Sequence, residues 1–237
     1  MTIAFLVVAV LAALALTRLP GAIRGRNPIV VASAFTIALA FALITPPVYE
    51  AVDRLLPFEN ATDLLAKLLL FTGLLLAGTQ VARAYDAPRT LRLVSGLPGA
   101  LVFVEVFVVE VLLFVAAEPT GRAADLAVDL DQGVVRLYST VATAYPAYIF
   151  ALLLPHVVRG IRSSRTSARV TSALLTAGGA LALVRFAIGL VTLGVPGAYP
   201  VGQVVSGLAA VLVAGGLSLI HISEPTRRQK KKKKNTT

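Results

Sequence analysis

The chain has 237 residues, of which 57% are hydrophobic and only 14% are charged, and its formal net charge is +10. A soluble domain keeps a larger share of charged residues at its surface, so this composition excludes an ordinary soluble enzyme or nucleic-acid-binding domain. The absence of cysteine excludes disulfides and thiolate metal sites, and two histidines are too few for a histidine-rich metal centre. No phosphate loop, zinc-protease motif or nucleophile elbow occurs, so we expect neither an enzyme, nor a cofactor, nor a metal site.

Seven stretches of the sequence are apolar and long enough to cross a membrane. A spanning helix needs about 20 such residues, because lipid offers no partner to an unpaired backbone group. The sequence therefore predicts an all-α, polytopic bundle of transmembrane helices, with the lipid bilayer as its main partner. The predicted spans cover residues 2–19, 29–45, 64–82, 93–117, 134–158, 170–193 and 202–220.

Two prolines end the second predicted span, and an amphipathic segment follows them. Pro46 and Pro47 lack the N–H that would continue the preceding helix. Residues 48–56 then alternate apolar and charged side chains at helical spacing. This pattern predicts a short helix that lies in the outer membrane interface.

The same region carries a family resemblance. The run LITPPVY at residues 43–49, followed by AVDRLL at 51–56 and by Asn60, resembles an actinobacterial family of seven-helix integral membrane proteins. The similarity covers residues 28–92. That family is labelled as transporters and its function is unknown, so the resemblance implies a multi-pass plasma-membrane protein and supplies no catalytic residues. Family members continue after the seventh helix into a cytoplasmic domain, which we expect to be missing here.

The connections between the predicted spans alternate in charge. The second and fourth connections are mainly acidic and the sixth has no charge, whereas the first, third and fifth are basic. Basic loops stay in the cytoplasm, so the alternation predicts an outside N-terminus and a cytoplasmic C-terminus. The basic connections hold Arg18, Arg24, Arg26, Arg83, Arg89, Arg92, Arg159, Arg162, Arg165 and Arg169.

Charged residues inside the predicted spans form the candidate polar site. They are Lys67 in the third span, Glu105 and Glu110 in the fourth, Arg185 in the sixth, and Arg136 at the outer mouth of the fifth. Such charges cost several kcal/mol in lipid unless they are paired or hydrated. Lys67, Glu110 and Arg185 share a layer roughly 7 to 12 Å below the outer helix ends. Glu105 lies deeper and points about 140° away from Glu110 around the helix.

Small residues around Arg185 favour an inward position for its side chain. Gly178, Ala182, Arg185 and Gly189 recur at spacings that place them on one face of the sixth span, which lets helix backbones approach closely. Glu110 is then expected to meet either Arg185 or Lys67. The two interpretations left open are a structural ion pair and a polar pocket, open to the outside, that binds a ligand or relays a proton. Lys67 also lies close enough to the boundary to snorkel.

Two functions fit these features. Charged residues within the membrane favour a transporter of a small molecule or ion. The odd number of spans and the outside N-terminus favour a sensor or regulator whose cytoplasmic output domain has been lost.

The last residues differ in composition from the rest. Residues 217–227 resemble the translation of a DNA-sequencing adaptor, and Lys230 to Lys234 follow, whereas Lys67 is the only lysine upstream. We therefore expect a transmembrane domain over residues 1–216 and a non-native tail over 217–237. The alternative for this tail is a polybasic segment that binds anionic lipid.

Overall fold

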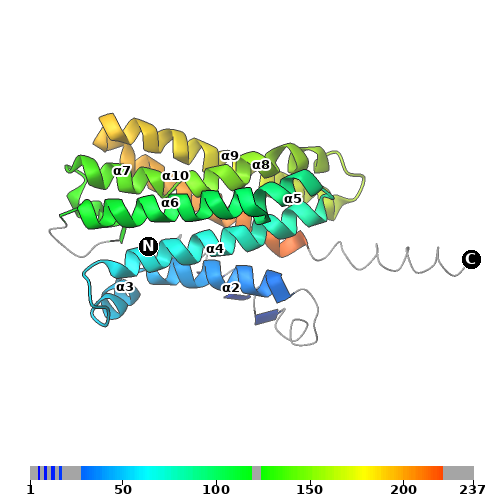
Figure 1. Ribbon diagram of the computed structural model, residues 1–237. Coiled ribbons are helices and arrows are strands. Elements are labelled where there is room, and N and C mark those ends of the chain that lie inside the picture. Colours follow the sequence, from blue (N-terminus) through cyan, green and yellow to red (C-terminus); the bar gives the residue numbers. More distant parts are fainter. Residues whose placement is uncertain are drawn as a thin grey trace, which may run out of the picture.

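The computed structural model describes residues 28–118 and 124–220, together with seven residues between Phe5 and Thr17. All regular structure in this part of the chain is helical, and its long helices run side by side in one bundle (Figure 1). The elements are α2 (Pro28–Leu43), α3 (Pro46–Asp53), α4 (Ala61–Ala84), α5 (Pro88–Ser95), α6 (Leu97–Ala116), η1 (Ala124–Asp129), α7 (Gly133–Val141), α8 (Ala144–Gly160), α9 (Thr166–Gly194), η2 (Pro196–Ala198) and α10 (Tyr199–Ile220).

A sharp turn separates α2 from α3, whose axes differ by 86°. Thr45, between them, has the extended backbone that is usual before a proline, and Pro46 and Pro47 occupy the first turn of α3. The short helix predicted from the amphipathic pattern is therefore confirmed. The preceding helix ends at Leu43, two residues earlier than expected.

Two of the predicted spans are each built from two helices. The fourth begins at Pro88 rather than at residue 93, and it is interrupted at Gly96, whose backbone is extended. The fifth is interrupted between α7 and α8, close to Pro146. Proline cannot donate a hydrogen bond to the carbonyl four residues earlier and its ring crowds that carbonyl, which accounts for the break at Ala142.

Several of these helices are suited to a membrane. Five helical stretches are long and apolar enough to cross one, and the bent pair α2–α3 makes a sixth if it is counted as a single span. The first predicted span, 2–19, falls mostly outside the described residues. The five stretches are Ala61–Ala84, Pro88–Ala116, Gly133–Gly160, Thr166–Gly194 and Pro196–Leu219.

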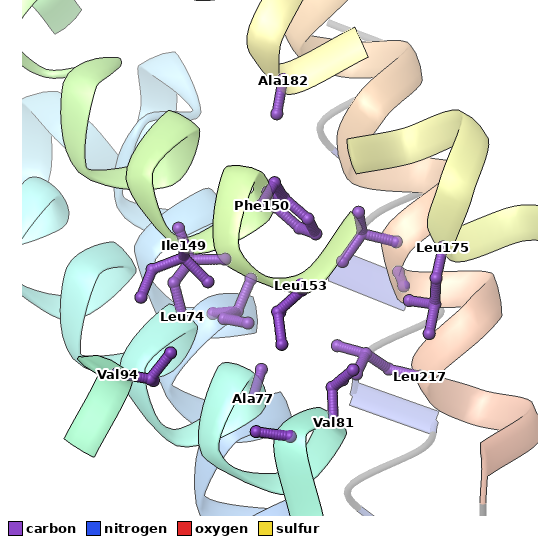
Figure 2. Packing of buried hydrophobic residues seen from close by; sticks show 14 of the residues in the cluster. Leu74, Ala77, Val81, Val94, Ile149, Phe150, Leu153, Leu175, Ala182 and Leu217 are labelled. Atoms are coloured by element: carbon purple, nitrogen blue, oxygen red, sulfur yellow. The ribbon is translucent and has the colours of Figure 1, made fainter. Parts of the chain in front are cut away.

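The bundle core lies where α4, α8, α9 and α10 meet. Leu74 and Val81 of α4 pack with Leu153 of α8, Leu175 of α9 and Leu217 of α10 in one buried apolar cluster (Figure 2). Among the helices, α9 contacts both α8 and α10, and α2 contacts α4. These contacts leave α2 and α4 on one side of the bundle and α9 and α10 on the other.

The outward face of α6 is uncovered and, apart from Glu105, apolar. Only Gly99 and Glu110 of this helix are buried, whereas Leu97, Leu112 and Val115 are 74%, 63% and 76% exposed. Water would disfavour so large an apolar surface, whereas lipid solvates it. The exposed faces and the long apolar helices are those of a membrane-embedded protein.

Candidate functional site

A cavity of about 780 Å³ lies between α2 and α4 on one side and α8, α9 and α10 on the other. Its wall is apolar over most of its length and becomes polar where α4 and α10 begin and where α9 approaches its end. The polar lining is contributed mainly by Asp63, Lys67, Ser139, Arg185, Gln203 and Ser206. Two of the five predicted site residues, Lys67 and Arg185, therefore reach the same cavity.

Lys67 is the centre of a buried ion cluster. Its Nζ lies 3.2 Å from Oδ2 of Asp63 and 3.2 Å from Oε2 of Glu110. The same ammonium group lies 3.1 Å from the centre of the Tyr138 ring, at cation–π distance. Glu110 is fully buried and Lys67 is only 8% exposed. The Lys67 side chain thus points into the protein rather than snorkelling to the membrane surface.

Four helical positions bring this cluster together. Asp63 and Lys67 are four residues apart on α4, which places them on one face one turn apart. Glu110 reaches them from α6 and Tyr138 from α7. The Tyr138 hydroxyl donates a hydrogen bond to Oδ2 of Asp63, so one carboxylate joins α4 to α7.

The start of α4 is held by a second buried network. The carboxylate of Asp53, at the end of α3, accepts hydrogen bonds from the backbone N–H groups of Asn60 at 3.0 Å and Thr62 at 3.2 Å. The Tyr49 hydroxyl donates to Oδ1 of Asn60 at 2.7 Å. Asn60 has a left-handed backbone, with φ of 61°, a conformation that asparagine tolerates better than most residues. Because Asp63 follows one turn later, this network fixes the position of the ion cluster relative to α3.

Arg185 stands apart from that cluster. Its Nε donates a hydrogen bond to Oγ of Ser206 on α10 at 3.0 Å, and the side chain is 5% exposed. The guanidinium group lies against Gly202, where an added Cβ would come within 3.0 Å of its Cζ. No carboxylate among the described side chains pairs with Arg185. Of the two partners of Glu110 that the sequence left open, the structure therefore pairs it with Lys67 and not with Arg185.

The other three predicted site residues do not line the cavity: Glu110 belongs to the ion cluster, and Arg136 and Glu105 lie apart from it. Nη1 of Arg136 donates to the backbone carbonyls of Leu130 at 3.1 Å and Asp131 at 3.2 Å, so this arginine secures the connection before α7. Glu105 is exposed on the uncovered face of α6, away from Glu110. Its separation from Glu110 agrees with the helical geometry expected from the sequence.

Three residues of the site were not predicted as members of it: Asp63, Tyr138 and Ser206. The sequence could have identified Asp63, because it stands four residues before Lys67 and so lies on the same helix face. α4 begins at Ala61, three residues before the predicted start of the span at residue 64, so Asp63 falls in the predicted connection and not in the span. Ser206 is one of many small residues in its helix, and only the tertiary contact with Arg185 distinguishes it.

No metal site is evident in the part of the chain that the structure describes, where three or more acidic or histidine side chains nowhere converge. The cavity offers instead an ammonium group paired with carboxylates and a separate guanidinium group, both within reach of a bound molecule. No protein-family profile, curated protein or solved structure matches the chain. The function has to be inferred from this geometry.

Proposed function

We propose that the chain is a seven-span protein of the plasma membrane that transports a small molecule or ion, with proton movement through the Lys67 cluster. The observation that carries the proposal is the cavity of about 780 Å³ that Lys67 and Asp63 line directly. Cavities of this size are typical of small-molecule sites. The resemblance to the actinobacterial family labelled as transporters points in the same direction.

The charge balance of the cluster supports proton coupling. Among its described members, one ammonium group faces two carboxyl groups, those of Asp63 and Glu110. Two ionised carboxylates beside one ammonium group repel each other, and this repulsion is costly in a medium of low dielectric. A proton on one carboxyl group removes the repulsion, and its release restores it. Binding of a molecule beside Lys67 is thereby linked to protonation of the cluster.

The proposed orientation supports a route from the outer side. With the basic connections in the cytoplasm, the polar end of the cavity faces outward, because α4 and α10 begin there. The bilayer core is about 30 Å thick, so a cavity that extends inward from this end along several helices covers much of the distance. Lipid surrounds the outer faces of the helices, including that of α6.

The transport proposal is tested by replacing Glu110 with glutamine, which removes its charge and keeps its shape. Cells that express the wild-type protein should change the internal level of at least one solute, measured by mass spectrometry, and a protonophore should abolish the change. Glu110→Gln should match cells without the protein. Glu118→Gln, in the exposed residue just after α6, is the control and should behave as wild type.

Two results would contradict the transport proposal. One is a solute change that persists unaltered in Glu110→Gln. The other is a wild-type protein that moves no solute while Glu110→Gln alters gene expression, which would favour the sensor alternative.

A further inference from the structure

Arg185 is a buried cation that has no matching anion among the described residues. Its only hydrogen bond in the described part of the chain runs from Nε to the neutral hydroxyl of Ser206, at 3.0 Å. The two Nη groups have no protein partner among the described residues, although the side chain is only 5% exposed. A buried charge without compensation costs several kcal/mol, so this position calls for an anion that the described protein does not supply.

The guanidinium group is held in one orientation. Gly202 leaves room for it to lie against α10, and Ser206, one turn further along that helix, fixes Nε. A Cβ at Gly189, one turn further along Arg185's own helix, would lie 3.4 Å from Nη1, so α9 also lies close to the group. The free edge of a fixed guanidinium plane matches a carboxylate or phosphate with two parallel hydrogen bonds.

The rest of the cavity is suited to an apolar body. Beyond the polar end its lining includes Leu74, Phe150, Val213 and Ala214. Along α10, Ser206 and Ala214 are about 12 Å apart at the usual rise per residue. An anion bound at Arg185 therefore has an apolar channel of about that length beside it.

We propose that Arg185 binds the anionic head group of an amphiphile, a carboxylate or phosphate on an alkyl chain, whose apolar part occupies the cavity. The inference deepens the proposed function, since it names the class of molecule that the transporter would carry. Lys67 does not serve the same purpose, because Asp63 and Glu110 already neutralise it. Arg185 supplies the positive charge that is left for the ligand.

Binding is tested on the purified full chain in an uncharged detergent by calorimetry. The probes are decanoate, decyl phosphate, inorganic phosphate and decyltrimethylammonium. We expect both decyl anions to bind, inorganic phosphate to bind at least about tenfold more weakly because it lacks the apolar part, and the cation not to bind.

Two variants and a control connect this binding to Arg185. Arg185→Gln should weaken decyl phosphate binding at least about tenfold, as expected for loss of a charge-assisted hydrogen-bonded pair. Gly202→Ala keeps the charge but crowds the guanidinium group, and should also weaken binding. Arg169→Gln changes the same charge at an exposed position of α9 and should bind as wild type. Thermal unfolding shows that each variant is folded, and Gly202→Ala provides the test if Arg185→Gln does not fold.

A lipid and a free amphiphile share this chemistry, and nanodiscs separate them. If phosphatidylglycerol discs weaken decanoate binding relative to phosphatidylcholine discs, a lipid head group occupies the site; equal binding identifies a free amphiphile. Unchanged affinity in a folded Arg185→Gln, or inorganic phosphate binding as tightly as decyl phosphate, would overturn the inference. Transport that still depends on Glu110 would survive that result, whereas Arg185-dependent binding without any flux would overturn transport alone.

Discussion

The pairing of Lys67 could be predicted only in part from the sequence. Lys67 was expected either to pair with Glu110 or to snorkel, and the pair is the arrangement found, with Nζ 3.2 Å from Oε2. The depth of both residues follows from helix geometry, so a pairing in one layer could be predicted. The identity of the partner could not, because Arg185 lies in the same predicted layer and only the packing of α6 against α4 and α7 decides between them.

At this scale we predict that Lys67→Met strongly destabilises the protein. The substitution leaves the carboxyl groups of Asp63 and Glu110 buried without their cation, which costs about 3–5 kcal/mol when a buried pair is broken. Thermal unfolding of the purified protein in detergent measures the loss.

The matched control is Arg54→Met, which removes the ion pair with Glu50 on α3. Both of these side chains are more than half exposed, at 69% and 57%, so at most about 1 kcal/mol is expected. Equal unfolding temperatures for the two variants would show that the Lys67 cluster does not stabilise the fold.

For whole helices, in contrast to the partner of Glu110, the local sequence pattern predicts more than it leaves to packing. Apolar length alone located the helices around residues 64–82, 170–193 and 202–220 to within a few residues of α4, α9 and α10. The breaks within longer spans were harder to place, since Gly96 and Pro146 interrupt helices that hydrophobicity alone presents as continuous. The stripe of small residues on α9 was predicted to face the bundle, and Gly178, Ala182 and Gly189 are indeed buried.

The close approach of α9 to α10 leads to a prediction about Gly178. A Cβ there would lie 2.7 Å from Cγ2 of Val213 and 3.1 Å from the carbonyl oxygen of Ala209. Gly178→Val should therefore force the helices apart and cost about 1–3 kcal/mol, as overpacking does. Unfolding in detergent again gives the value.

Gly194→Val, at the end of the same helix, is the control for this substitution. Nothing lies within 4 Å of a Cβ at Gly194, so the control should unfold close to wild type. A Gly178→Val protein as stable as the control would mean that the two helices do not pack as closely as described.

The distribution of apolar and charged side chains over the whole molecule matches a lipid solvent. Its helices present large apolar side chains outward, most clearly along α6, while most of their charged residues, with Glu105 as an exception, lie inside the bundle or at the helix ends. Composition excluded an ordinary soluble domain, and the length of the apolar stretches then predicted an all-helical membrane-embedded protein. A polar pocket was one of two interpretations left open, but the size and lining of the cavity could not be foreseen, since they depend on how far α2 and α4 stand from α10, a distance that no local pattern encodes.

At the scale of the whole molecule, the proposed orientation is tested by labelling single cysteines in a chain that has none. Leu55→Cys, at a position that is 85% exposed just after α3, should react with a membrane-impermeant maleimide on intact cells. Ser164→Cys, between α8 and α9, should react only after the cells are permeabilised. Labelling of Ser164→Cys on intact cells would reverse the proposed topology.

The turn between α2 and α3 has a consequence for the vertical position of the protein. With α3 lying flat at the water–lipid boundary, as its amphipathic sequence predicts, the hydrogen bonds that Asp53 accepts from the backbone of Asn60 and Thr62 tie the beginning of α4 to that surface. The immersion of Lys67 is then set by protein geometry rather than by acyl-chain length. Bilayers of different thickness would have to adapt at the opposite ends of the helices, leaving the ion cluster equally deep in each of them.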